Sequence, residues 1–110
     1  SKTCKVLEPS QDDSPFFQPI SVDTSKLACS KINFARAIQS KGVTVNPHYK
    51  YVVCEWPWVR SYLGDDFICA NAIDIRDKTF NLLFNENYGQ KEIAFIKNAI
   101  CKTENKYLKF

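Results

Sequence analysis

The sequence predicts an α+β domain in which one α-helix packs on a roughly four-stranded antiparallel β-sheet. Three observations predict this class. One segment places apolar residues at helical spacing, several later segments are rich in β-branched and aromatic residues, and short turn-forming sequences separate them. Such short links favour antiparallel pairing. The 110 residues, 45% of them hydrophobic, suffice for one folded domain.

The helix is expected over residues 30–41. Ser30 suits the N-cap position, and Gly42 suits a left-handed cap at the other end. Four apolar residues fall on one side at helical spacing: Ile32, Phe34, Ala35 and Ile38. A helix of about three turns must be held by packing rather than by propensity.

Strands are expected where β-branched and aromatic residues concentrate, with turns between them. The expected strands are residues 49–54, 67–75, 79–85 and 91–97. The helix should cover one face of this sheet and leave the other face partly open. Residues 1–26 are expected to form an extended arm, and residues 27–110 the α+β domain. Prolines in the arm disfavour helix in the residues before them.

Cysteine usage points to an oxidising compartment and hence to secretion. The chain has one histidine and no Cys-x-x-Cys motif, which argues against zinc, and no cofactor is expected. No signal peptide is visible, so we expect that it has been removed. The five cysteines are Cys4, Cys29, Cys54, Cys69 and Cys101.

The net charge of +3, from 15 basic and 12 acidic residues, is small for a dedicated nucleic-acid-binding protein. No segment approaches the roughly 20 apolar residues of a membrane span, so no membrane partner is expected. Trp56 and Trp58 flank a proline, with Tyr62 nearby. These three residues belong either to the core or to an exposed recognition patch, because aromatic residues are frequent binding hot spots.

Three short motifs, in a shared order, resemble the small guanyl-specific ribonucleases of filamentous fungi. They are Asn-Pro-His-Tyr-Lys-Tyr at 46–51, Glu-Trp-Pro at 55–57 and Leu-Phe-Asn-Glu-Asn at 83–87. The resemblance covers roughly residues 29–101 and implies a microbial ribonuclease-like fold. Leu-Ala-Cys at 27–29 is similar to the aromatic-x-Cys motif in the ribonuclease-like secreted effectors of powdery mildew fungi, with leucine in place of the aromatic residue.

The resemblance implies that the catalytic residues are missing. The family uses a glutamate assisted by histidine as base, an arginine to hold phosphate and a second histidine as acid. Here His48 matches the first histidine, and Glu55 matches either the catalytic or the guanine-contacting glutamate. Asn81 falls at the arginine position and Lys97 at the acid position. A lysine side chain, with an ordinary pKa of about 10.4 against about 6.5 for histidine, is a poor acid at neutral pH.

The resemblance also implies a disulfide between Cys29 and Cys101. Cys54 and Cys69, on expected neighbouring strands, form a second candidate pair. Cys4 is then free or cross-linked to another chain. In an alternative scheme, Cys4 pairs with one of the two strand cysteines.

The resemblance therefore implies a secreted fungal effector of the virulence or avirulence type, a pseudo-ribonuclease that has a ribonuclease-like fold without catalytic activity and acts by binding. Its expected partners are a plant host protein, an immune receptor included, or weakly bound RNA, either at the host cell surface or after translocation into the cell. We expect a monomer. Two alternatives stay open: an active or residual guanyl-preferring ribonuclease or toxin, and an unrelated secreted binding module.

Overall fold

In the computed structural model, which describes residues 1–64 and 66–109, four strands form one antiparallel sheet in the order β1-β2-β4-β3. The strands are β1 (Cys4–Val6), β2 (Phe17–Val22), β3 (Val45–Asn46) and β4 (Thr79–Leu83). The helices in this part of the chain are α1 (Lys31–Gln39), α2 (Pro57–Leu63), α3 (Ala70–Lys78) and α4 (Gln90–Tyr107). The expected α+β class and antiparallel sheet are confirmed, but residues 1–64 and 66–109 form four α-helices rather than one.

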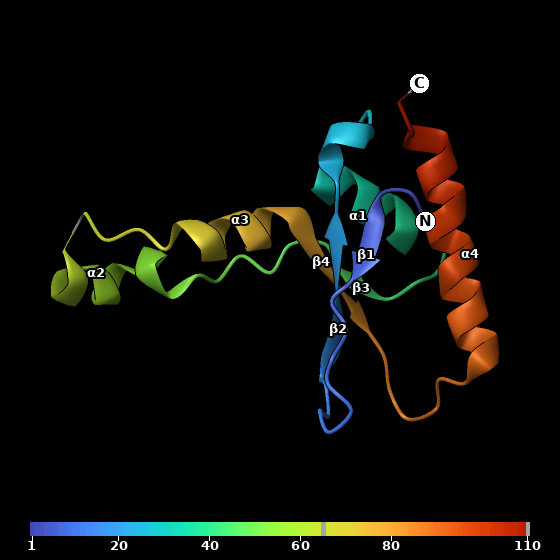
Figure 1. Ribbon diagram of the computed structural model, residues 1–110, viewed down its shortest axis with the longest axis horizontal. Helices are drawn as coiled ribbons and strands as arrows, with labels where there is room; N and C mark the ends of the chain where they lie inside the picture. The colour runs from blue at the N-terminus through green and yellow to red at the C-terminus, as the bar shows by residue number, and fades with distance from the viewer. Residues whose placement is uncertain (65, 110) are drawn as a thin grey trace.

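The two faces of the sheet have different coverings. On one face, Ile20 of β2 lies opposite Phe80 of β4, and both are buried beneath α1 and α4. On the other face, Pro19 lies opposite Asn81. Residues 49–78 leave the body on this second side and carry α2 and α3 outward (Figure 1). We call residues 49–78 the side lobe.

The expected helix over residues 30–41 is confirmed as α1. The Ser30 hydroxyl accepts a hydrogen bond of 3.2 Å from the backbone N–H of Asn33, which caps the first turn. Gly42 has a φ of +94°, a left-handed conformation that glycine adopts without strain. Phe34 and Ile38 are fully buried, so α1 is held by packing on the sheet.

The strand expected at 91–97 is wrong, because this segment is the first half of α4. The buried side of α4 continues well beyond residue 97, through Ala99, Ile100 and Thr103. A seven-residue window cannot distinguish a period of 3.6 from a period of 2 when the apolar residues are close together. The helix begins where the Glu92 carboxylate accepts a 2.8 Å hydrogen bond from the backbone N–H of Gly89.

The strand expected at 67–75 is also wrong, since most of it belongs to α3. None of the residues of α3 is buried, and Ile75 is exposed. The β-branched residues that suggested a strand therefore lie outside the core, where no neighbouring strand is available to pair with them. The expected strand at 79–85 is confirmed as β4, which begins directly after α3.

The strand expected at 49–54 is absent. Tyr49 and Tyr51 are exposed, and the segment ends in a short 3-10 turn at Val53–Glu55. The backbone carbonyl of Lys50 accepts a hydrogen bond of 3.1 Å from the Arg76 guanidinium. In a strand, this carbonyl would instead accept from a backbone N–H of a neighbouring strand.

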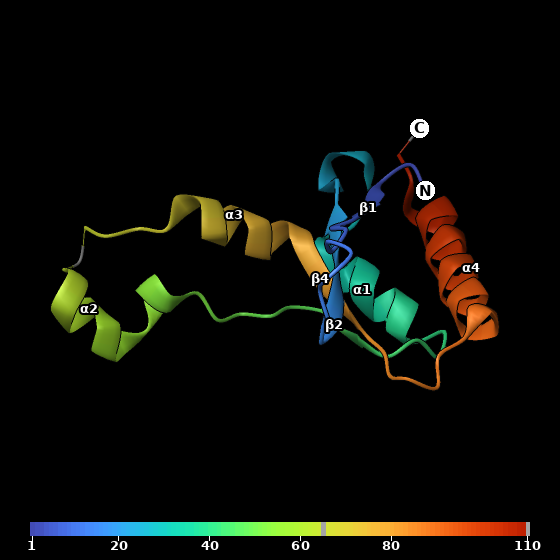
Figure 2. The same cartoon turned by 60° about the horizontal axis from the view of Figure 1, so that its bottom comes forward.

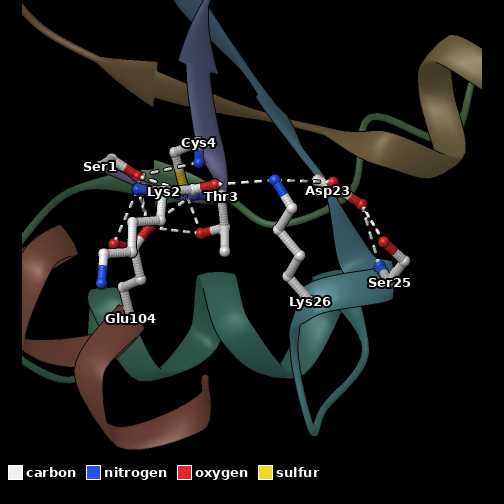
Figure 3. Close-up of polar contacts among 8 residues, drawn as sticks. All are labelled: Ser1, Lys2, Thr3, Cys4, Asp23, Ser25, Lys26 and Glu104. Atoms are coloured by element: carbon white, nitrogen blue, oxygen red, sulfur yellow. Dashed lines mark hydrogen bonds and ion pairs between the residues drawn. The ribbon is translucent and has the colours of Figure 1, made fainter. Parts of the chain in front are cut away.

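The N-terminal segment supplies β1 and β2, so the extended residues before position 27 form half of the sheet. A carboxylate on α4 holds the first residues of this N-terminal segment in place (Figure 3). Glu104, only 4% exposed, accepts hydrogen bonds from the backbone N–H groups of Lys2 and Thr3 and from the hydroxyls of Ser1 and Thr3. These donors hold the pKa of Glu104 at about 2 although burial opposes the shift.

Candidate functional site

The outer end of the side lobe presents an apolar surface to solvent. Helix α2 has no buried residue, and residues 64 and 66–68 after it are exposed as well. Trp58 is 64% exposed and Tyr62 is 88% exposed. We define the lobe tip as five exposed residues: Trp58, Tyr62, Leu63, Phe67 and Ile68.

The sequence left open whether the three aromatic residues of this segment belong to the core or to a recognition patch. Trp58 and Tyr62 lie on the lobe tip, whereas Trp56 is half-buried at the start of α2. The rings of Trp56 and Trp58 lie 5.2 Å apart, so Trp56 supports the exposed Trp58. The indole N–H of Trp56 is buried and has no hydrogen-bond partner among the described residues.

An ion pair closes the base of the lobe. Arg76 of α3 donates to the Glu55 carboxylate at 2.5 Å and to the Asp77 carboxylate at 3.1 Å. These contacts raise the pKa of Arg76, with the Glu55 hydrogen bond as the main cause. Arg76 therefore ties two parts of the lobe that are 21 residues apart in the chain.

His48 lies next to a buried lysine at the start of α1. The Lys31 ammonium donates a 2.8 Å hydrogen bond to Nδ1 of His48 and a 2.9 Å bond to the carbonyl of Pro47. Because an ammonium only donates, this contact requires Nδ1 as the acceptor, which is met by a neutral ring with its proton on Nε2. Burial first, and then the positive charge of Lys31, lower the pKa of His48. Burial likewise lowers the pKa of Lys31.

The structure brings together some of the residues expected at a vestigial catalytic site and separates one of them. His48 and Glu55 both lie near Arg76, which acts electrostatically on each of them. Asn81 is on β4, on the sheet face that the lobe adjoins, and it pairs with Asn46. Lys97 is exposed on α4, which packs on the other side of the sheet (Figures 1 and 2).

The sequence did not point to Lys31 and Arg76, the two cations that contact His48 and Glu55. Their roles arise from long-range contacts, to residues 17 and 21 positions away, for which no local motif exists. The cluster is balanced in charge, because Lys31 and Arg76 face the carboxylates of Glu55 and Asp77. Both cations are engaged, so the cluster holds the lobe in place rather than presenting a free anion-binding group.

All five cysteines are thiols in this structure. Cys54 and Cys69 nevertheless lie together at the base of the lobe, where the Cys69 backbone N–H donates to the Cys54 sulfur at 3.2 Å. The hydrogen bond between the two side chains is the main cause that raises the pKa of Cys69. Cys29 precedes α1 and Cys101 lies on α4.

The described residues contain no cluster of three or more histidine, cysteine or acidic side chains that would hold a metal ion. Within the same residues, no helix combines the length and the apolar character that crossing a membrane requires. The chain matches no protein-family model and no curated protein.

Proposed function

We propose that this protein is a secreted, non-catalytic binding protein of the fungal effector type, and that the lobe tip engages a plant host protein. The pathogen, the host and the ribonuclease-like ancestry of the scaffold rest on the sequence resemblance. The binding role rests on one observation: the helix at the end of a projecting lobe has no buried residue, while Trp58 and Tyr62 on it are largely exposed.

The lobe tip has the properties of an interface rather than of ordinary protein surface. A helix of seven residues is marginal in water without tertiary packing, and α2 rests on little beyond the adjoining 3-10 turn. Exposed apolar residues that are contiguous, rather than scattered, mark interaction sites. Tryptophan and tyrosine also carry much of the binding energy at interfaces. A partner would bury the face that the fold leaves open.

The charge of the tip favours a protein over a nucleic acid. Between Glu55 and Ala70, Arg60 is the one basic residue, and two aspartates follow it in the sequence. Affinity for nucleic acid depends on several lysine or arginine contacts to phosphates, which this segment does not have. An apolar cleft in a protein is the surface that complements the lobe tip.

The arrangement of polar residues supports the non-catalytic part of the proposal. Acid–base cleavage of RNA needs a base, an acid and a phosphate clamp around one bond. His48 is bound by Lys31, Glu55 is bound by Arg76, and Lys97 lies across the sheet on α4.

Site-specific photocrosslinking tests the binding role. A photoreactive phenylalanine at position 62, in the full chain, should capture a defined leaf protein, whereas the same group at exposed position 98 of α4 should not. The Trp58→Ser variant should reduce both this crosslink and the affinity of the purified partner by about tenfold or more. Equal capture at both positions, or unchanged affinity of Trp58→Ser with the purified partner, would refute the role of the tip.

A residual ribonuclease is the second candidate, favoured by the gathering of His48 and Glu55 around Arg76. Its test is cleavage of guanosine-containing RNA by the purified protein. We expect no turnover above the buffer rate. Cleavage that is abolished in both Glu55→Gln and His48→Ala would replace the proposal with this alternative.

A further inference from the structure

A pocket lies on the lobe side of the sheet, apart from the lobe tip. Its volume is about 600 Å³, within the usual range for small-molecule sites. Phe17 and Pro19 of β2 and Ile75 of α3 line the pocket. Tyr49 and Tyr51 complete it, with the Tyr49 ring 6.3 Å from Phe17 and 5.6 Å from Tyr51.

The pocket is lined by apolar and aromatic groups and is neutral in charge. Among the described residues, Arg76 is the one charged residue that lines it, and its guanidinium is already bound by Glu55, Asp77 and the carbonyl of Lys50. A charged ligand would have to break one of these contacts. The pocket therefore favours a neutral ligand that offers aromatic surface to the rings.

Asn81 supplies a polar group in the otherwise apolar lining. It lines the pocket and is only 6% exposed, yet its carboxamide forms no hydrogen bond with any described residue. Of its cross-strand neighbours, Pro19 has an apolar side chain, and the side-chain Oδ1 of Asn46 accepts a hydrogen bond from the backbone N–H of His48. Among the described residues, Trp56 Nε1 is the one fully buried side-chain polar atom without a partner, so the unpaired carboxamide atoms of Asn81 are reached by solvent from the pocket and are open to a ligand.

We propose that this pocket binds a small, neutral, planar aromatic molecule with an amide-like edge, whose N–H and C=O groups pair with the Asn81 carboxamide. An amide edge offers one donor and one acceptor, which is the complement of what a carboxamide presents. The aromatic part lies against Tyr49, Tyr51 and Phe17. The site is separate from the lobe tip and does not depend on the proposed host interaction.

Two matched probes test the site: 2-quinolone, a planar bicycle with a lactam edge, and N-methyl-2-quinolone, which lacks the N–H donor. Titrations of the full chain followed by NMR should show saturable shifts for 2-quinolone at Tyr49, Tyr51 and the Asn81 side-chain NH₂. N-methyl-2-quinolone should bind about fivefold to tenfold more weakly, as expected for the loss of hydrogen bonding.

The variant Asn81→Leu, similar in size but without the carboxamide, should remove the preference between the probes, whereas Asn98→Leu on the exposed side of α4 should keep it. Should Asn81→Leu fail to fold, Tyr51→Ser at the exposed rim should weaken both probes instead. Equal affinities of the two probes for the unmodified protein, absent saturation, or shifts confined to another surface would overturn the proposal.

Discussion

The backbone N–H of Cys69 points at the sulfur of Cys54, 3.2 Å away, at the base of the side lobe. The two residues are 15 positions apart, and the lobe tip lies between them. The contact places two thiols where a disulfide would close a loop around α2.

Oxidation should therefore join Cys54 to Cys69. In buffer with oxidised glutathione, two thiols become one disulfide and glutathione is reduced. A loop of 15 residues should stabilise the fold by about 3 kcal/mol in the chain-entropy model. Peptide mass spectrometry identifies the pair, and urea unfolding measures the gain against a variant with serine at both positions. Recovery of both cysteines in alkylated, reduced form after oxidation would contradict this prediction.

Removal of the Glu104 charge should loosen the N-terminus. Glu104→Gln keeps the shape but loses charge-assisted hydrogen bonds from residues 1–3, so the free energy of unfolding should fall by about 1–3 kcal/mol at neutral pH. Urea unfolding measures the loss. Glu8→Gln, at an exposed site, is the matched control and should change little.

The same carboxylate predicts an acid dependence. The pKa of Glu104 is about 2 in the folded protein against an ordinary value of 4.5, so its contribution is fully present above about pH 4.5. It should be lost progressively as the pH falls toward 2. Unfolding of the unmodified protein and of Glu104→Gln, measured from pH 7 to pH 2, should converge at the acid end. A difference that stays constant over this range would refute the assignment.

His48 should titrate below the ordinary histidine range. Burial and the charge of Lys31 lower the pKa of His48, so replacing the cation with Lys31→Met should raise this pKa. The chain has one histidine, and its ring protons therefore give a direct NMR titration. Lys102→Met, exposed on α4, should leave the pKa unchanged. Since the unfolded chain binds the proton more readily, stability should decline as the pH falls through about 6.5 and level off below the folded pKa.

Arg76→Ala should increase local opening at the base of the side lobe. The variant loses hydrogen bonds to Glu55, Asp77 and the carbonyl of Lys50, but Glu55 and Asp77 are solvent-exposed, so screening limits the cost to about 1 kcal/mol. Amide hydrogen exchange should quicken in residues 53–78 and stay unchanged in α4. Arg60→Ala, on the exposed helix α2, serves as the control. Uniform loss of protection across the whole chain would contradict this local effect.

The elements that were predictable from the sequence carry their signals locally. Ser30 and Gly42 bracket α1, and the run at 79–85 contains β4. Helix α4 was missed because its buried side, through Ile100 and Thr103, extends beyond the window that suggested a strand. Helix α3 was missed because none of its residues is buried in the core, a placement that propensity does not indicate.

Some residues of the candidate site were likewise predictable from the sequence, and others were not. The aromatic residues around Pro57 drew attention from the sequence, because two tryptophans beside a proline are difficult to bury together. Lys31 and the unpaired Asn81 carboxamide could not be recognised, since their significance depends on which distant residues surround them. The spacing of residues along the chain does not reveal contacts between residues that are far apart in the sequence.

The two ends of the described chain meet on α4. The carboxylate of Glu104 holds residues 1–3. The last turn of α4 is fixed by a 2.7 Å hydrogen bond from the N–H of Ala28 to the carbonyl of Tyr107. The lobe tip lies at the opposite extreme of the molecule (Figure 1). A sensor surface that tethers the protein through either end would therefore orient Trp58 and Tyr62 toward the solution. Immobilisation through α2 would hide the very residues whose binding is to be measured.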